Sequence, residues 1–321
     1  MNKQLFTVKP KQSIPPDHYY RYLLKELSAS GKTIDDLISS KKLYLRISIV
    51  GNCNFKCKFC HNEGGPTEGS LSLSDSRFII SMAKDIGYNR VQFTGGEPLL
   101  NKQLERHLEL CRHYIDDVGI TTNGSLLVRR ISSLIEAGLT RIHLSLQRET
   151  LIANHPTRWT IPDWLATVLQ KCSDAGVVVR LNIPVEPSEL SAAREFISEV
   201  GHLNCDLLLF SLLPNDSLQH RQQYIDELKS ICSAEKERRE KQTTSQIYAR
   251  EYFKPSGIRC GSCEAKNVCA ESSRSLRVGV DMTLRPCLAT RYWDIPITRL
   301  DTRDSLLKAT LFALDYSPFN H

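Results

Sequence analysis

Cys53-Asn54-Phe55-Lys56-Cys57-Lys58-Phe59-Cys60 is the stretch from which the fold of this chain can be read. Its three cysteines stand four and three positions apart, shortly after an apolar run at residues 43–50. Three thiolates can bind three irons of a [4Fe–4S] cluster, because soft sulfur ligands suit such clusters, and the fourth iron then stays open to a ligand that is not protein. A zinc site or three unrelated core cysteines are the alternatives, but zinc sites usually pair Cys-x2-Cys units with a fourth ligand. The spacing therefore favours an iron–sulfur cluster.

The remaining cysteines divide into a second cluster and a scattered group. The chain has 11 cysteines, and clustered cysteines outside an oxidising compartment indicate metal ligands rather than disulfides. The second cluster lies toward the carboxyl end and consists of Cys260, Cys263, Cys269 and Cys287. It suits zinc or a second iron–sulfur cluster, and the first motif favours the latter. The scattered group is expected to be ordinary buried thiols, at Cys111, Cys172, Cys205 and Cys232.

Length and composition indicate a globular chain with one large domain and a smaller addition. The sequence has 321 residues, of which 41% are hydrophobic, and its net charge is 42 − 36 = +6. The basic surplus suits an anionic substrate, although an ordinary basic surface is the simpler explanation. No apolar run is long enough to span a membrane, and residues 1–10 lack the apolar segment of a signal peptide, so we expect a cytoplasmic location.

From residue 43 onward, short apolar runs alternate with amphipathic segments of helical length. Apolar patterning predicts strands at residues 44–50, 90–94, 118–122, 141–146, 177–184 and 205–212. Helices are predicted between them, at residues 74–87, 102–116, 126–137, 162–175, 188–200 and 217–241. Successive strand–helix units require parallel strands joined by crossover helices. The sequence therefore predicts an α/β fold, a partial (β/α)6 barrel of the TIM type.

Three segments are expected on this basis. Residues 1–42 form an N-terminal leader with helices at 17–29 and 33–39, and residues 43–245 form the barrel. Residues 246–321 form a small C-terminal extension, where the strand–helix alternation stops, with the second cysteine cluster and a last helix at 303–316.

Polar or glycine-rich positions fall where the predicted strands end. They are Gly95-Gly96-Glu97-Pro98 after the second strand, Asn123 after the third, Ser145 in the fourth and Asn182 in the fifth. Barrel enzymes place their active sites at the carboxyl ends of the strands, so one shared site is expected. Bare glycine lets a backbone approach a ligand closely, although residues 95–98 also suit an ordinary strand-to-helix turn.

The cysteine spacing resembles that of the radical S-adenosylmethionine (SAM) enzymes, whose open iron binds the amino and carboxylate groups of SAM. The resemblance implies that Cys53, Cys57 and Cys60 hold this cluster. It also implies that residues 95–98 are the superfamily's glycine-rich motif, which binds the amino group of the methionine part, with Glu97 taking part directly or through the turn.

Four further residues are assigned to the SAM site through the same resemblance. Phe59 matches the aromatic residue that lines the adenine. Asn123 and Ser145 would meet the ribose or the methionine carboxylate, although each is also compatible with a purely structural cap. Asn182 is placed with them.

Longer matches resemble the GTP 3′,8-cyclase branch of the superfamily. They are Leu45-Arg46-Ile47-Ser48, Cys57-Lys58-Phe59-Cys60-His61, Phe93-Thr94-Gly95-Gly96-Glu97-Pro98-Leu99, Thr121-Thr122-Asn123-Gly124, Leu144-Ser145-Leu146, residues 180–195 and residues 276–287. Through this resemblance Cys260, Cys263 and Cys287 would hold an auxiliary [4Fe–4S] cluster. Cys269 has no counterpart in the branch, and we expect it to be a fourth ligand that closes the open iron; a free thiol is the alternative.

Two other positions differ from the branch. Arg277 matches the second arginine of its substrate-binding pair, whereas Ser275 replaces the first and Arg274 stands beside it, so Arg277 and Arg274 are the candidate substrate contacts. The sequence ends at residues 317–321 without the paired glycines that the resemblance leads us to expect.

The resemblance implies the chemistry as well. A reduced cluster would give one electron to SAM, and the resulting 5′-deoxyadenosyl radical would remove hydrogen from the substrate, with flavodoxin or ferredoxin as the electron donor. The expected substrate is a nucleotide, a nucleoside or a related small metabolite. A ribosomally made peptide is the alternative, although a leader of this length is short for a peptide-recognition domain. A zinc-binding nucleic-acid module is the non-enzymatic alternative, but the sequence lacks the basic stripe with interleaved aromatics that it requires.

Overall fold

The structure is a computed structural model of the 321-residue chain. It describes residues 16–31, 33, 36, 44–57, 60, 63, 68–153, 158–211, 218–240, 245–249, 275–287, 294–297 and 303–314. The chain divides into two compact units. The first contains residues 1–55, 60–118 and 252–321, and the second contains residues 56–59 and 119–251.

The first unit is built on five strands. They lie in the order β10-β9-β8-β1-β2 and are β1 (Tyr44–Val50), β2 (Arg90–Gly95), β8 (Ser275–Val278), β9 (Thr283–Arg285) and β10 (Ile295–Pro296). β1 pairs in parallel with both β2 and β8, whereas β9 is antiparallel to β8 and to β10. A strand from near the carboxyl end of the chain therefore lies directly beside the strand that precedes the cysteine motif.

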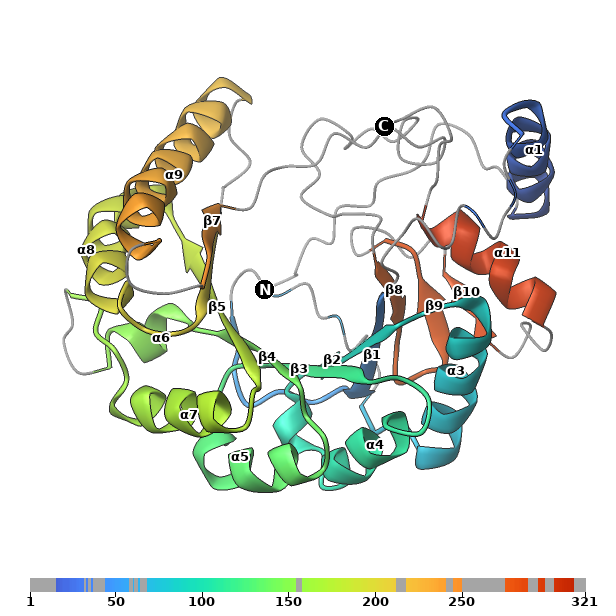
Figure 1. The fold of residues 1–321 in the computed structure, drawn as a ribbon, viewed down its shortest axis with the longest axis horizontal. Coiled ribbons are helices and arrows are strands. Elements are labelled where there is room, and N and C mark those ends of the chain that lie inside the picture. The colour runs from blue at the N-terminus through green and yellow to red at the C-terminus, as the bar shows by residue number, and fades with distance from the viewer. Residues whose placement is uncertain are drawn as a thin grey trace. The chain divides into compact units, whose positions relative to one another are not determined.

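Alternation along these strands separates an apolar face from a polar one. Leu45 of β1, Leu276 of β8 and Leu284 of β9 line a small apolar cavity together with Ile79 and Ala83 of α3 (Leu73–Ile86). The intervening positions of β1 carry polar side chains, and they point to the opposite face. Residues of α3 and of a C-terminal helix, α11 (Arg303–Leu314), line this cavity, and Figure 1 shows both helices on the same side of the strands of the first unit.

The helices of the first unit begin and end at recognisable signals. Ser72 caps α3 by accepting the N–H of Asp75, and Gly87 ends the helix in the left-handed conformation. α4 (Leu104–Cys111) packs on α3, where the hydroxyl of Ser76 bonds Nδ1 of the fully buried His107 at 2.9 Å. The other helices of the unit are α1 (Pro16–Ala29), the one-turn helix η1 (Pro98–Leu100) and α11 (Arg303–Leu314).

The second unit is a parallel sheet with strand order β3-β4-β5-β6-β7. Its strands are β3 (Asp117–Thr122, of which the first two residues group with the first unit), β4 (Arg141–Ser145), β5 (Val178–Val185), β6 (Asp206–Ser211) and β7 (Ile247–Ala249). Its helices are α5 (Leu127–Glu136), α6 (Arg148–Leu151), α7 (Asp163–Asp174), η2 (Pro187–Glu189), α8 (Leu190–Val200) and α9 (Leu218–Arg239). In β5, Val179, Leu181 and Ile183 are buried, whereas Arg180 and Asn182 between them are only half-buried, so this sheet also has an open polar face.

The predicted elements agree with the structure through residue 240. All six predicted strands and the six helices between them are present, with ends shifted by a few residues; the helix predicted at 102–116 is the shortest match, because it ends at Cys111. The helices predicted at 17–29 and 303–316 are also present, whereas the one at 33–39 lies mostly outside the described residues.

Four short strands lie beyond the six that the sequence predicts. β7, β8, β9 and β10 are additional short strands, and β8 extends the sheet at β1. They are two to four residues long, which is too short for apolar periodicity to reveal. Among the described helices, none combines the length and the apolarity needed to cross a bilayer.

Candidate active site

The glycine-rich turn after β2 is packed against the segment that leads from β1 to Cys53. Gly96 donates its N–H to the carbonyl oxygen of Val50 at 2.8 Å, and Glu97 donates to that of Asn52 at 2.9 Å. A side-chain carbon on Gly95 would collide with the Val50 carbonyl, and one on Gly96 with that of Asn52. Gly95 also has a φ of 141°, which L side chains rarely adopt. Glycine is therefore required here for the turn to support the chain that enters the cysteine motif.

Glu97 and Pro98 form the buried end of this turn. The Glu97 side chain accepts the N–H of Leu99 at 3.0 Å and so begins η1, and the residue is only 1% exposed. Asn101, which follows η1, donates its side-chain amide to the carbonyl oxygen of Ile49 at 3.0 Å. The carboxylate thus has a structural role in the turn, and its contact with the amino group of SAM stays a prediction.

The cysteines of the motif are accessible to solvent. Cys53 and Cys60 are exposed and Cys57 is half-buried, and the N–H of Phe55 donates to Sγ of Cys53 at 3.4 Å, which favours negative charge on that sulfur. Phe59 lies outside the described residues. Among the residues that the structure describes, no three Cys, His, Asp or Glu side chains converge in a metal-binding arrangement. Ligation by the three cysteines therefore stays a prediction from their spacing.

The four scattered cysteines are ordinary core residues, as predicted. All of them are buried. Burial raises the pKa of Cys172 to about 11 and that of Cys232 to about 12, and it also raises the pKa of Cys111. Burial likewise raises the pKa of Cys205, to about 12, although the nearby Arg239 acts in the opposite direction. These thiols stay neutral and are poor candidates for metal ligands.

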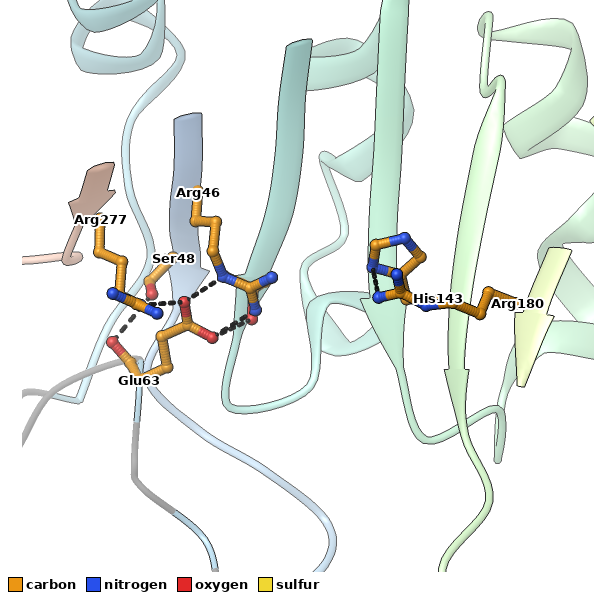
Figure 2. A network of polar contacts seen from close by, with 7 residues as sticks. Arg46, Ser48, Glu63, His143, Arg180 and Arg277 are labelled. Carbon is orange, nitrogen blue, oxygen red and sulfur yellow. Dashed lines mark hydrogen bonds and ion pairs between the residues drawn. The ribbon is translucent and has the colours of Figure 1, made fainter. Parts of the chain in front are cut away.

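Glu63, three positions after Cys60, is the centre of an ion-pair network in the first unit (Figure 2). Arg46 of β1 donates from Nε and Nη2 to its two carboxylate oxygens, at 2.5 and 2.6 Å. Nε of Arg277 on β8 lies 3.4 Å from Oε1, and the hydroxyl of Thr94 on β2 donates to Oε2 at 3.2 Å. The Ser48 hydroxyl donates to the backbone oxygen of Glu63 at 3.0 Å. Three neighbouring strands therefore hold one residue of the segment that follows the cysteine motif.

The charge of Glu63 is fixed by its surroundings. Burial by itself raises the pKa of this carboxyl, but Arg46, Arg277 and the Thr94 hydrogen bond outweigh burial and lower the pKa to about 2. The carboxylate is therefore ionised at every pH at which the protein is expected to work.

The structure places two of the predicted SAM contacts side by side in the second unit. Ser145 and Asn182 are register partners on β4 and β5, and both are half-buried on the open face of the sheet. Asn123 has a different setting, since its side-chain oxygen accepts the N–H of Ser125 at 3.0 Å and caps the turn after β3. Asn123 therefore acts as a structural cap, which is the alternative that the sequence also allowed. Contact of Ser145, Asn182 or Asn123 with SAM stays a prediction.

A second cluster, built around the single arginine Arg180, lies on the same open face. Arg180 of β5 donates to Oδ1 of Asn182 at 3.0 Å, to Nδ1 of His143 at 3.0 Å and to the hydroxyl of Tyr248 at 3.2 Å. Figure 2 shows the contact between Arg180 and His143. Asp206 stands opposite Arg180 on β6 but accepts the N–H of Gln246 instead. Within the described residues Arg180 thus has neutral partners alone.

Comparison with known proteins identifies the family. Residues 47–190 match the model of the radical SAM superfamily. A probable GTP 3′,8-cyclase of Methanosarcina mazei is 31% identical over 76% of this chain and 77% of its own length, and one of Methanosarcina acetivorans is 30% identical over 80% of both. The chain belongs to the radical SAM superfamily. It is a radical SAM enzyme, and the non-enzymatic zinc module is thereby excluded.

Solved structures confirm the fold of this radical SAM chain. Streptococcus suis SuiB bound to S-adenosylmethionine superposes with a TM-score of 0.62 and 16% identity, over 89% of this chain and 69% of SuiB. A structure of tagged anSMEcpe with bound AdoMet gives a TM-score of 0.52 and 14% identity, over 77% of this chain and 74% of that one. The predicted partial barrel with a C-terminal addition is therefore correct, and the addition contributes antiparallel strands.

The residues present fit the cofactors that a radical SAM enzyme uses. The motif offers accessible thiols, while the four cysteines outside the two clusters are buried. The bare backbone of Gly95 and Gly96 stands at the entrance to the motif. Soft thiolates suit an iron–sulfur cluster, and the half-buried glycine turn lies beside the chain that enters the motif, where the superfamily binds the methionine part of SAM.

The C-terminal candidates are only partly described. Cys287 is half-buried and stands two residues after the end of β9, and Arg277 is buried on β8 beside Glu63. Cys260, Cys263, Cys269 and Arg274 lie outside the described residues. Their assignment to an auxiliary site stays a prediction.

Sequence reasoning missed three charged residues of the polar faces. Arg46 and Arg180 occupy alternate, polar positions within predicted strands, and that alternation was the available signal for placing them on an open face. Glu63 had no such signal, because it lies outside any strand and its partners are 17 and 214 residues away in sequence.

Proposed function

We propose that this radical SAM enzyme abstracts a hydrogen atom from a nucleotide, a nucleoside or a related small metabolite, in a reaction of the GTP 3′,8-cyclase type. The observation that carries the proposal is the identity of 30 and 31% to two proteins named probable GTP 3′,8-cyclase, over more than three quarters of each chain. The solved structures reported above are only 14 and 16% identical and inform the fold alone.

In this proposal the cofactors supply the radical, and the chain positions the cofactors and the substrate. When bound, the reduced cluster and SAM provide a 5′-deoxyadenosyl radical, with the electron coming from a donor such as flavodoxin or ferredoxin. Cys53, Cys57 and Cys60 hold the cluster, and residues 95–98 hold the methionine part of SAM. The chain excludes water and fixes the target carbon near the radical.

The arginine clusters support an anionic substrate. Arg180 donates to neutral partners and forms no ion pair with a carboxylate among the described residues, although Asp206 is its register partner on β6. Arg46 and Arg277 share the single carboxylate of Glu63. Guanidinium groups bind phosphate in a bidentate manner, which suits the phosphate groups of a nucleotide. We assign Arg277 and Arg180 to substrate binding, with Arg274 as a further candidate.

The direct test is nucleotide-dependent cleavage of SAM. Reconstituted protein is incubated without oxygen with SAM and dithionite, alone or with GTP, ATP or guanosine, and 5′-deoxyadenosine is quantified by mass spectrometry. A nucleotide is expected to raise its release, and a substrate deuterated at the reacting carbon is expected to transfer deuterium into 5′-deoxyadenosine. If no nucleotide or nucleoside changes the release, the proposed substrate class is wrong.

A peptide substrate is the second candidate, because one specific observation favours it. SuiB bound to its precursor peptide SuiA superposes on 99% of this chain with a TM-score of 0.58. In the same assay, a peptide encoded beside the gene for this chain would then stimulate 5′-deoxyadenosine release, and nucleotides would not. This outcome would replace the nucleotide proposal with the peptide one.

We also propose that an auxiliary [4Fe–4S] cluster is held by Cys260, Cys263, Cys269 and Cys287. A fourth thiolate closes the iron that would otherwise bind substrate, which leaves the cluster a structural or electron-transfer role. The test uses a background in which the three motif cysteines are alanine. There, Cys269→Ala is expected to lower the iron content while the control Cys111→Ala does not. A cluster that persists without Cys269 and binds an added ligand at iron would show an open site instead.

A further inference from the structure

Three arginines form a row across the polar face of the first unit. Arg46 of β1 is the register partner of Arg277 of β8, and Arg277 is the register partner of Arg285 of β9. Register partners on neighbouring strands point to the same face and lie about 5 Å apart. Their side chains are 16, 8 and 2% exposed. Like charges placed directly opposite each other are destabilising, so this row requires compensation.

Among the described residues, three carboxylates pair with the row, and they come from different segments. Glu63 pairs with Arg46 and Arg277. Asp281, in the turn between β8 and β9, pairs with Arg285, and Asp294 lies 3.5 Å from its Nε. In the described part of the chain, these six side chains carry three positive and three negative charges. Glu63 is the member that belongs to the segment after the cysteine motif, three residues beyond Cys60.

The other end of the row leads to the second cysteine cluster. Cys287 stands two residues after Arg285. The Arg285 guanidinium lies over Gly279 of the β8–β9 hairpin so closely that a side-chain carbon there would collide with it. The position of Arg285 is therefore fixed by the hairpin and by its two aspartates, and a shift of the row would move the strand that leads to Cys287.

We propose that Glu63 is a positioning residue that couples the two cluster sites through the row of Arg46, Arg277 and Arg285. It ties residue 63, three positions after Cys60, to β1 and β8, and by pairing with both Arg46 and Arg277 it keeps β8 and β9 in the register that places Cys287. The role in cluster placement rests on the proposed assignment of Cys60 and Cys287 as ligands, whereas the coupling between the two segments does not depend on it.

The coupling is measured first in iron-free protein, by hydrogen–deuterium exchange. Glu63→Gln keeps the shape of the side chain and removes its charge. The matched control is Asp117→Asn, because Asp117 forms a 2.6 Å ion pair with Arg90 at the amino end of β2 in the same unit, and neither residue pairs with a member of the row. Glu63→Gln is expected to speed exchange of amides in residues 275–287 by about tenfold, and Asp117→Asn is expected to leave them unchanged. Equal exchange of residues 275–287 in wild type and Glu63→Gln would overturn the proposal.

The second measurement tests whether Glu63 affects the auxiliary cluster, of which it is not a ligand. Glu63→Gln is introduced into protein whose Cys53, Cys57 and Cys60 are alanine, and the iron content and electron paramagnetic resonance of the remaining cluster are recorded. The variant is expected to lower the iron content at least twofold or to shift the resonance lines, and Asp117→Asn is expected to do neither. Unchanged iron and spectra would contradict the coupling. If the background binds no iron, the auxiliary cluster of the proposed function is wrong, and the exchange measurement alone decides the coupling.

Discussion

The two arginine clusters of this enzyme use the same side chain in opposite ways. In the first unit Arg46 and Arg277 face the carboxylate of Glu63, and all three side chains are at most 16% exposed. In the second unit Arg180 lies on an open sheet face with an amide, an imidazole and a phenol as its partners. A buried guanidinium that pairs with a carboxylate holds the two segments that carry them together, because separating the pair leaves an uncompensated charge. A half-buried guanidinium with neutral partners keeps its charge for a ligand. The comparison therefore assigns stability to the pairing of Arg46 with Glu63 and substrate binding to Arg180, while Arg277, the second arginine on Glu63, is available for both roles.

Loss of the Glu63 charge should produce the largest effect on stability. Its pKa is lowered from 4.5 to about 2, so the ionised form contributes about 3 kcal/mol to the free energy of unfolding at pH 7. Glu63→Gln should therefore lower the free energy of unfolding in urea by about that amount, while Arg180→Gln should lower it by less than about 1 kcal/mol. Equal losses in the two variants would remove the distinction between the clusters.

The pH dependence of the same variant sharpens the comparison. The pKa of Glu63 is lower in the folded chain than in the unfolded one, so its contribution is complete above about pH 4.5 and is lost as pH falls toward 2. The difference in unfolding free energy between wild type and Glu63→Gln should be constant from pH 7 to about pH 5 and then decrease on further acidification. A difference that is unchanged down to pH 3 would show that the ion pairs are not its source.

Loss of the Arg180 charge should have the smallest effect on stability but a clear effect on substrate binding. Arg180→Gln removes a charge that forms no ion pair with a carboxylate among the described residues, so KM for an anionic substrate should rise about tenfold with kcat little changed. Arg158→Gln is the matched control, since Arg158 is an exposed arginine of the same unit that already pairs with Glu199. Similar KM values for the Arg180 and Arg158 variants would exclude Arg180 from substrate binding.

The sequence predicted the fold more completely than it predicted the contacts of the site. Strands such as Tyr44–Val50 were predicted correctly because alternating or continuous apolar runs record which face is buried. β8 was missed because four residues are too few for such a pattern, and its place beside β1 is set by pairing across the length of the chain. The same reason explains Glu63: its partners Arg46 and Arg277 meet only when β8 pairs with β1. The cysteine motif could be recognised without knowing which strands pair, since its three cysteines are close together in the sequence.

Formation of 5′-deoxyadenosine from SAM tests the central claim most directly. Anaerobically reconstituted protein with dithionite and SAM should release 5′-deoxyadenosine and methionine in equal amounts. A variant in which Cys53, Cys57 and Cys60 are alanine should release neither above the level seen without protein. Cleavage of SAM by that variant at the wild-type rate would contradict the assignment of the motif and of the chemistry built on it.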